Sequence, residues 1–215
     1  AMFRECKGAD EILDNYILLL RSLFKSSLTD QLFAGVYMTG ILPIKKYGHE
    51  SAVSDFYEYS MVEPRPLQEY IGFTTEEVKS LCQKYDKDYT IMQEWYDGYT
   101  VGGVHVYNPK SVMESILRDK YSSYWTKTET YEALRNYIDM NFDGLKDDVL
   151  SMMAGEMVPV NTGSFSNDMT TFHGEDDVLT LLIHLGYLGY DFSHKSVFIP
   201  NNEIRGEFVN AVSVS

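Results

Sequence analysis

The string Trp95-Tyr96-Asp97-Gly98-Tyr99 is the most distinctive stretch of this chain. A helix is predicted from about Asp88, and Gly98 is expected to end it, because glycine readily takes the left-handed conformation at a helix C-terminus. The three aromatic side chains favour one of two roles. They lock the helix end against the next segment, which is the commoner arrangement, or they form a platform that binds a partner.

Further helix signals lie on both sides of this string. Thr74 and Glu77 have the spacing of a capping box, in which each side chain binds a free backbone N–H of the other residue. Asn108 followed by Pro109 predicts the start of the next helix, since asparagine caps and proline fits the first turn. Towards the end of the chain, the pattern predicts a helix over 176–185, a β-hairpin over 187–199 and a last helix capped at 200–202.

The first part of the chain has a different pattern. A helix is predicted over 9–26, with Asp10 as its N-cap. The uncharged apolar run 32–39 then ends at Gly40, which predicts a strand buried on both faces, as in a parallel sheet. Because ligand loops follow such strands in α/β proteins, Lys45 and Lys46 are candidates for phosphate contacts. The alternative is that both lysines lie in a solvated loop.

Composition indicates an ordered globular protein with an acidic surface. The 215 residues are 44% hydrophobic and 23% charged, and 32 Asp and Glu against 18 Lys and Arg give a formal charge of -14. This charge disfavours non-specific binding to nucleic acid and leaves a protein partner as the better expectation. Cys6 and Cys82 form neither a disulfide framework nor a zinc motif, so a cytoplasmic protein is expected. We find no signal peptide and no membrane-spanning run.

No motif predicts a complete active site. The Walker A pattern Gly-x-x-x-x-Gly-Lys-Ser/Thr does not occur, and Gly102-Gly103 is interpreted as a turn. The histidines lack metal-ligand spacing, so no metal site is expected. The acidic clusters at 143–148 and 175–177 have two interpretations, as carboxylate sites or as helix starts whose dipole favours negative charge. The second fits 175–177 better.

Several strings, taken in order, resemble one family. They are Tyr37–Lys46, Glu94–Tyr99, Val106–Val112, Tyr124-Trp125, Leu185–Leu188 and Ile199–Ile204. Together they make the chain similar to the bacterial AAA-ATPase-like family, whose members are usually fused to a C-terminal PD-(D/E)XK nuclease-like domain. The similarity extends from about Phe3 to Val212.

The resemblance implies that this chain begins just after the Walker B strand and ends before the nuclease. Thr39 would then correspond to a sensor residue at a strand end, near the γ-phosphate, although it also suits a plain strand end. ATP and magnesium are implied for a complete family member. Without Walker A and Walker B residues, no cofactor is expected to bind this chain, and it is expected not to hydrolyse ATP alone.

The expected fold is α+β and predominantly helical, in three regions. Residues 1–66 would be a remnant of an ATPase α/β core, 67–155 a helical lid-like region, and 156–215 a winged-helix-like region. The first functional hypothesis is the lid and sensor portion of an AAA-ATPase-like protein. The alternative is a stand-alone module that binds a protein, or less favourably DNA, through the winged-helix-like region. Self-association through the exposed core strand is a further expectation.

Overall fold

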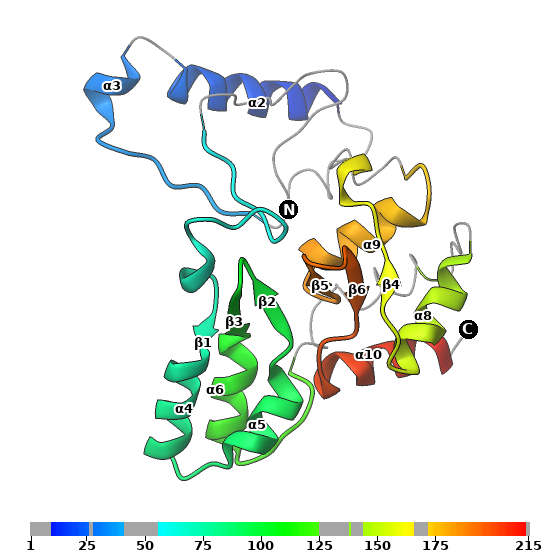
Figure 1. The fold of residues 1–215 in the computed structure, drawn as a ribbon. Coiled ribbons are helices and arrows are strands. Elements are labelled where there is room, and N and C mark those ends of the chain that lie inside the picture. Colours follow the sequence, from blue (N-terminus) through cyan, green and yellow to red (C-terminus); the bar gives the residue numbers. More distant parts are fainter. Residues whose placement is uncertain are drawn as a thin grey trace. The chain divides into compact units, whose positions relative to one another are not determined.

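The computed structural model describes residues 10–25, 28–40, 56–124, 138, 144–165 and 172–213 (Figure 1). In these residues, helices alternate with two small antiparallel sheets, which confirms the predicted α+β class. The described residues before Tyr59 belong to one compact unit, and those from Tyr59 onward belong to a second. No helix within the described ranges is both long enough and apolar enough to cross a lipid bilayer.

The first unit contains α2 (Asp10–Phe24) and the short α3 (Thr29–Leu32). α2 matches the helix predicted over 9–26. Ile17 and Leu20 are buried, but α2 also exposes large apolar side chains, namely Ile12, Leu18, Leu19 and Leu23. The ring of Phe24 packs against Phe33 and Phe56, with centroid distances of 5.9 and 5.5 Å.

The buried strand predicted over 32–39 is wrong. Leu32 ends α3, and the described residues 33–40 contain no strand. Their apolar side chains are exposed, including Tyr37 at 80%. An apolar run forms a strand only where a neighbouring strand supplies hydrogen bonds, and no described strand pairs with this segment.

The first half of the second unit covers residues 59–124. Its elements, in chain order, are η1 (Gln68–Tyr70), β1 (Phe73–Thr74), α4 (Thr75–Lys84), α5 (Tyr89–Tyr96), β2 (Tyr99–Val101), β3 (Val104–Tyr107) and α6 (Pro109–Arg118). The sheet has the order β1-β3-β2 and is antiparallel throughout. α4, α5 and α6 enclose a core of Val78, Cys82, Met92, Tyr96, Tyr107, Val112 and Ile116.

The caps predicted for this half form as expected. Thr74 accepts from the backbone N–H of Glu77, and Glu77 accepts from that of Thr74, which completes the capping box. Asn108 accepts from the N–H groups of Lys110 and Ser111, with Pro109 in the first turn of α6. Each cap satisfies donors that the helix itself leaves free, so these boundaries depend on neighbouring residues alone.

The second half covers residues 144–213. Its elements are α8 (Leu145–Met153), β4 (Val158–Pro159), η3 (Thr162–Ser164), α9 (Glu175–His184), β5 (Gly189–Asp191), β6 (Ser196–Phe198) and α10 (Asn202–Ser213). β5 and β6 form the predicted hairpin, and the antiparallel sheet has the order β4-β6-β5. Residues 177–183 of α9 are all buried, as expected of a helix that is apolar on most sides.

The two halves meet along β2 and β5 and through α10, which contacts α5 and α8 (Figure 1). Gly189 in β5 permits this approach. A Cβ on Gly189 would lie 2.9 Å from the carbonyl oxygen of Gly98 and 2.7 Å from the ring of Phe198. We call this junction between the two halves the seam.

Candidate functional site

The predicted string Trp95–Tyr99 lies at the seam. Tyr96 ends α5, Asp97 and Gly98 form the turn, and Tyr99 starts β2. Tyr96, Asp97 and Tyr99 are buried, and Trp95 is half-buried against the core of the first half. These side chains therefore contact the interior of the second unit instead of forming an exposed aromatic surface.

Gly98 is required by both its conformation and its neighbour. Its φ is +105°, a left-handed value that side chains with a Cβ rarely adopt. A Cβ at this position would also collide with the backbone carbonyl of Pro200. Gly98 was predicted to end the helix. The same residue also contacts the backbone of Pro200, in the segment before α10.

Asn201 connects this turn to α10. Its side-chain Nδ2 donates to the backbone carbonyl of Asp97 at 2.7 Å. Its Oδ1 accepts from the N–H of Ile204 at 3.0 Å and so caps α10, in agreement with the cap predicted over 200–202. The buried side-chain amide of Asn201 therefore forms a hydrogen bond to the backbone of each half.

The Asp97 carboxylate orients a histidine. Its Oδ1 accepts from the N–H of Gly98 at 2.7 Å and lies 3.2 Å from His105 Nδ1, while Gln93 donates to Oδ2 at 3.2 Å. The His105 side chain is 54% exposed. A buried carboxylate beside an imidazole can fix the ring tautomer and orientation, as in general-base pairs. Within the described residues, however, no Ser, Thr or Cys side chain forms a hydrogen bond with His105.

Sequence reasoning missed this pair because its members are eight residues apart on different elements. The available signal was the hairpin register. Thr100 pairs with His105 and Tyr99 with Val106 across β2 and β3, so the turn that precedes β2 lies beside the C-terminal end of β3, two to three positions from His105.

Tyr99 makes the next contact across the seam. Its hydroxyl donates to the carbonyl of Gly186, two residues after the end of α9, at 2.7 Å. Burial raises the pKa of the Tyr99 hydroxyl far above its usual value, so this group remains a neutral donor. The string Leu185–Leu188 is thereby tied to Glu94–Tyr99.

Two carboxylates of α10 complete the polar contacts of the seam. Glu203 Oε1 accepts from Ser111 Oγ at 3.0 Å and from the N–H of Tyr124 at 2.7 Å. Glu207 Oε1 accepts from Ser123 Oγ at 2.7 Å. Both glutamates are 2% exposed. Buried carboxylates need such donors, because an ionised group without hydrogen bonds is strongly disfavoured in the interior.

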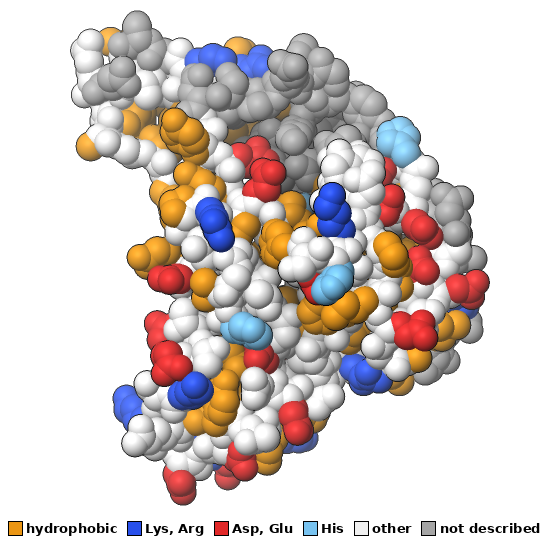
Figure 2. All heavy atoms as spheres, in the orientation of Figure 1, with side chains coloured by type: hydrophobic (Ala, Val, Ile, Leu, Met, Phe, Trp, Pro, Cys, Tyr) orange, Lys and Arg blue, Asp and Glu red, His pale blue; other side chains and the backbone are white. Residues whose placement is uncertain are grey.

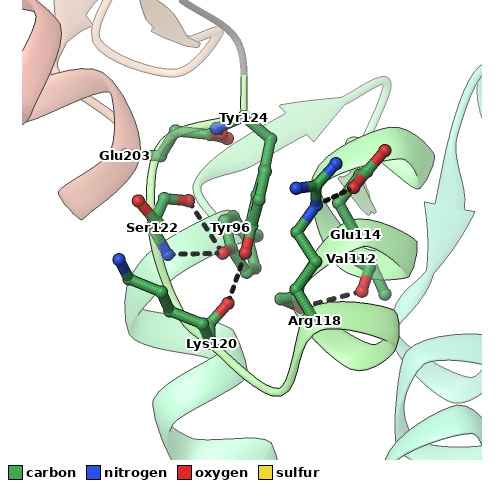
Figure 3. Close-up of polar contacts among 9 residues, drawn as sticks. Tyr96, Val112, Glu114, Arg118, Lys120, Ser122, Tyr124 and Glu203 are labelled. Carbon is green, nitrogen blue, oxygen red and sulfur yellow. Dashed lines mark hydrogen bonds and ion pairs between the residues drawn. The ribbon is translucent and has the colours of Figure 1, made fainter.

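Tyr96 lies near one of these glutamates, Glu203 (Figure 3). Its hydroxyl donates to the carbonyl of Ser122 at 3.0 Å and accepts from the N–H of Ser122 at 3.1 Å. Burial is the main cause that raises the Tyr96 pKa to about 12. Arg118 lies over the ring of Tyr124 and forms an ion pair with Glu114 at the exposed edge of this group.

The other predicted site residues are not part of the seam. Thr39 belongs to the first unit, is exposed and ends no strand. Lys45 and Lys46 lie outside the described residues. Asn108 and Pro109 start α6 and act as its cap.

The carboxylates at 175–177 lie in the first turn of α9, as the helix-start interpretation predicted. Asp176 accepts from the N–H of Asn161 at 2.9 Å, and Asp177 accepts from the N–H of His173 at 2.9 Å. Among the residues that the structure describes, no group of three or more His, Cys, Asp or Glu side chains could hold a metal ion.

Comparison with protein-family models, curated proteins and solved structures found no match to this chain. Support for a function therefore comes from the residues and their geometry.

Replacement of Gly98 tests the close contact at the seam. Gly98→Ala is expected to lower the free energy of unfolding by about 3 kcal/mol or more, because it adds steric overlap to left-handed strain. Gly103→Ala is the matched control, since Gly103 has φ +88° but open space around its Cβ position. It should cost only about 1 to 2 kcal/mol. Equal losses in urea unfolding would show that Pro200 contributes nothing to the requirement for glycine.

Replacement of Glu207 tests the cost of its burial. Burial raises the pKa of Glu207 in the folded state, partly offset by Ser123. The folded protein therefore binds more protons than the unfolded chain above the ordinary glutamate pKa, so this residue lowers stability as pH rises. The stability gain of Glu207→Gln over wild type should grow as pH rises from about 4, the ordinary glutamate pKa, towards neutral pH.

The measurement is urea unfolding of both proteins across that pH range. Glu69→Gln, at an exposed position, controls for the loss of one negative charge. A stability difference between Glu207→Gln and wild type that stays constant with pH would contradict the prediction.

Proposed function

We propose that this chain is a non-catalytic lid and sensor portion of an AAA-ATPase-like protein, which does not hydrolyse ATP alone. The observation that supports it best is the seam. Of the six strings that carry the resemblance, those from Glu94 onward contribute residues to one connected set of contacts. Positions whose side chains stabilise a fold are expected to stay similar among the members of a family. The strings that carry the resemblance contain such positions.

The element order of the second half supports a winged-helix-like region. Helix, strand, helix and hairpin follow one another as α8, β4, α9, β5 and β6, and the first strand pairs with the last in the order β4-β6-β5. In a helix-turn-helix protein the recognition helix must be exposed to enter the major groove. α9 is buried along most of its length and begins with three acidic residues.

The charge distribution also favours a protein partner over DNA. Asp and Glu side chains are spread over the face drawn in Figure 2, among basic and neutral ones, without one large basic patch. A formal charge of -14 repels phosphate groups.

Nucleotide titration tests the first proposal. Calorimetry with ATP and magnesium should give no saturable binding up to about 1 mM nucleotide, because the chain contains no Walker A loop to hold the phosphates. A Kd in the micromolar range would overturn the proposal. Thr39→Ala would then show whether the bound nucleotide depends on the residue proposed as the sensor.

A second candidate function is a module that associates with another polypeptide through its first unit. The supporting observation is the set of exposed large apolar side chains there, which are Ile12, Leu18, Leu19, Leu23, Leu28, Leu32, Phe33, Val36, Tyr37 and Met38. Exposed large apolar side chains are common on surfaces that bind another polypeptide. A second copy of this chain is the partner that we propose, in place of the strand pairing expected from the sequence.

Sedimentation at increasing concentration tests this second proposal. The wild-type chain should form dimers, and Leu18→Asp combined with Leu19→Asp should shift it to monomer by burying charge in the contact. Asn15→Asp, on an exposed position of the same helix, adds one charge and should leave the dimer intact. A wild-type chain that remains monomeric at all concentrations would contradict self-association.

A further inference from the structure

The segment Ser122–Tyr124, called the strap below, is held in an unusual way. It follows α6 and is neither helix nor strand. Within the described residues, the strap makes no backbone–backbone hydrogen bond. Both backbone groups of Ser122 bond to the Tyr96 hydroxyl, and the N–H of Tyr124 donates to Glu203 (Figure 3).

The surface beneath the strap is one face of α10. Glu203 and Glu207 are four residues apart, so both side chains lie on the same side of the helix. Glu203 accepts from the strap backbone, and Glu207 accepts from the Ser123 hydroxyl. Both carboxylates are buried with the strap in place.

Docking of the strap has two opposing effects on free energy. Hydrogen bonds to charged groups are stronger than those between neutral groups, and they favour docking. Burial of a carboxylate removes its hydration, and this opposes docking. The strap side chains are only half-buried, so apolar burial adds less than it does for Val112 in the neighbouring α6, which is fully buried.

We propose that the strap is a releasable element that detaches from α10 while the helices and both sheets of the second unit remain folded. Release hydrates Glu203 and Glu207 and frees the backbone groups of Ser122 and Tyr124. This conformational device does not depend on nucleotide binding or on self-association.

Native-state hydrogen exchange of the full chain, followed by NMR in low concentrations of urea, tests the strap. The N–H groups of Ser122 and Tyr124 should exchange at least about tenfold faster than those of Val112 in α6 and Leu182 in α9, through an opening that urea barely affects. If the strap amides exchange only through global unfolding, with the urea dependence of the core, the proposal is wrong.

Two matched variants give an independent measurement. Tyr96→Phe removes both hydrogen bonds of Ser122 and should speed its exchange about tenfold or more, while Leu182 keeps its rate. Tyr121→Phe removes a hydroxyl that bonds to the carbonyl of Asp88, outside the strap, and should leave Ser122 unchanged. No change in Tyr96→Phe, or an equal change at Leu182, would overturn the proposal. If Tyr96→Phe does not fold, the wild-type urea series decides.

Discussion

The backbone of Pro200 occupies the space where any residue other than glycine at position 98 would place its Cβ. This contact fixes the distance between the turn after α5 and the segment before α10. Asn201 can then cap α10 and reach the carbonyl of Asp97 at the same time. The positions of β2 beside β5, and of α10 beside α5, depend on this approach.

The seam combines apolar packing with polar groups that each need a partner from another element. Tyr99 finds an acceptor at the end of α9, and Glu203 finds donors on α6 and on the strap. A buried polar group without a hydrogen bond destabilises the folded state more than an exposed one does. Another arrangement of the two halves would leave these groups without partners and is therefore strongly disfavoured. The seam is therefore a source of specificity as well as of stability.

The same geometry bears on function. Most side chains of the Trp95–Tyr99 string are buried where the two halves meet. The neighbouring His105 in β3 is oriented by Asp97 and is exposed. α9 is buried over residues 177–183, so most of its surface is occupied by packing. Large apolar side chains are exposed on the first unit, and the proposed self-association would bury them.

The sequence alone determined the features that depend on near neighbours. The capping box of Thr74 and Glu77, the start of α6 at Asn108 and the cap of α10 follow from hydrogen bonds over two or three residues, so they were predictable. Tertiary structure decided the features that depend on distant partners. The apolar run 32–39 is not a strand because strand formation requires a pairing neighbour. The pairing of Asp97 with His105 depended on hairpin register. The burial of Glu203 depended on how α10 packs against α6 and the strap, and no local pattern encodes that packing.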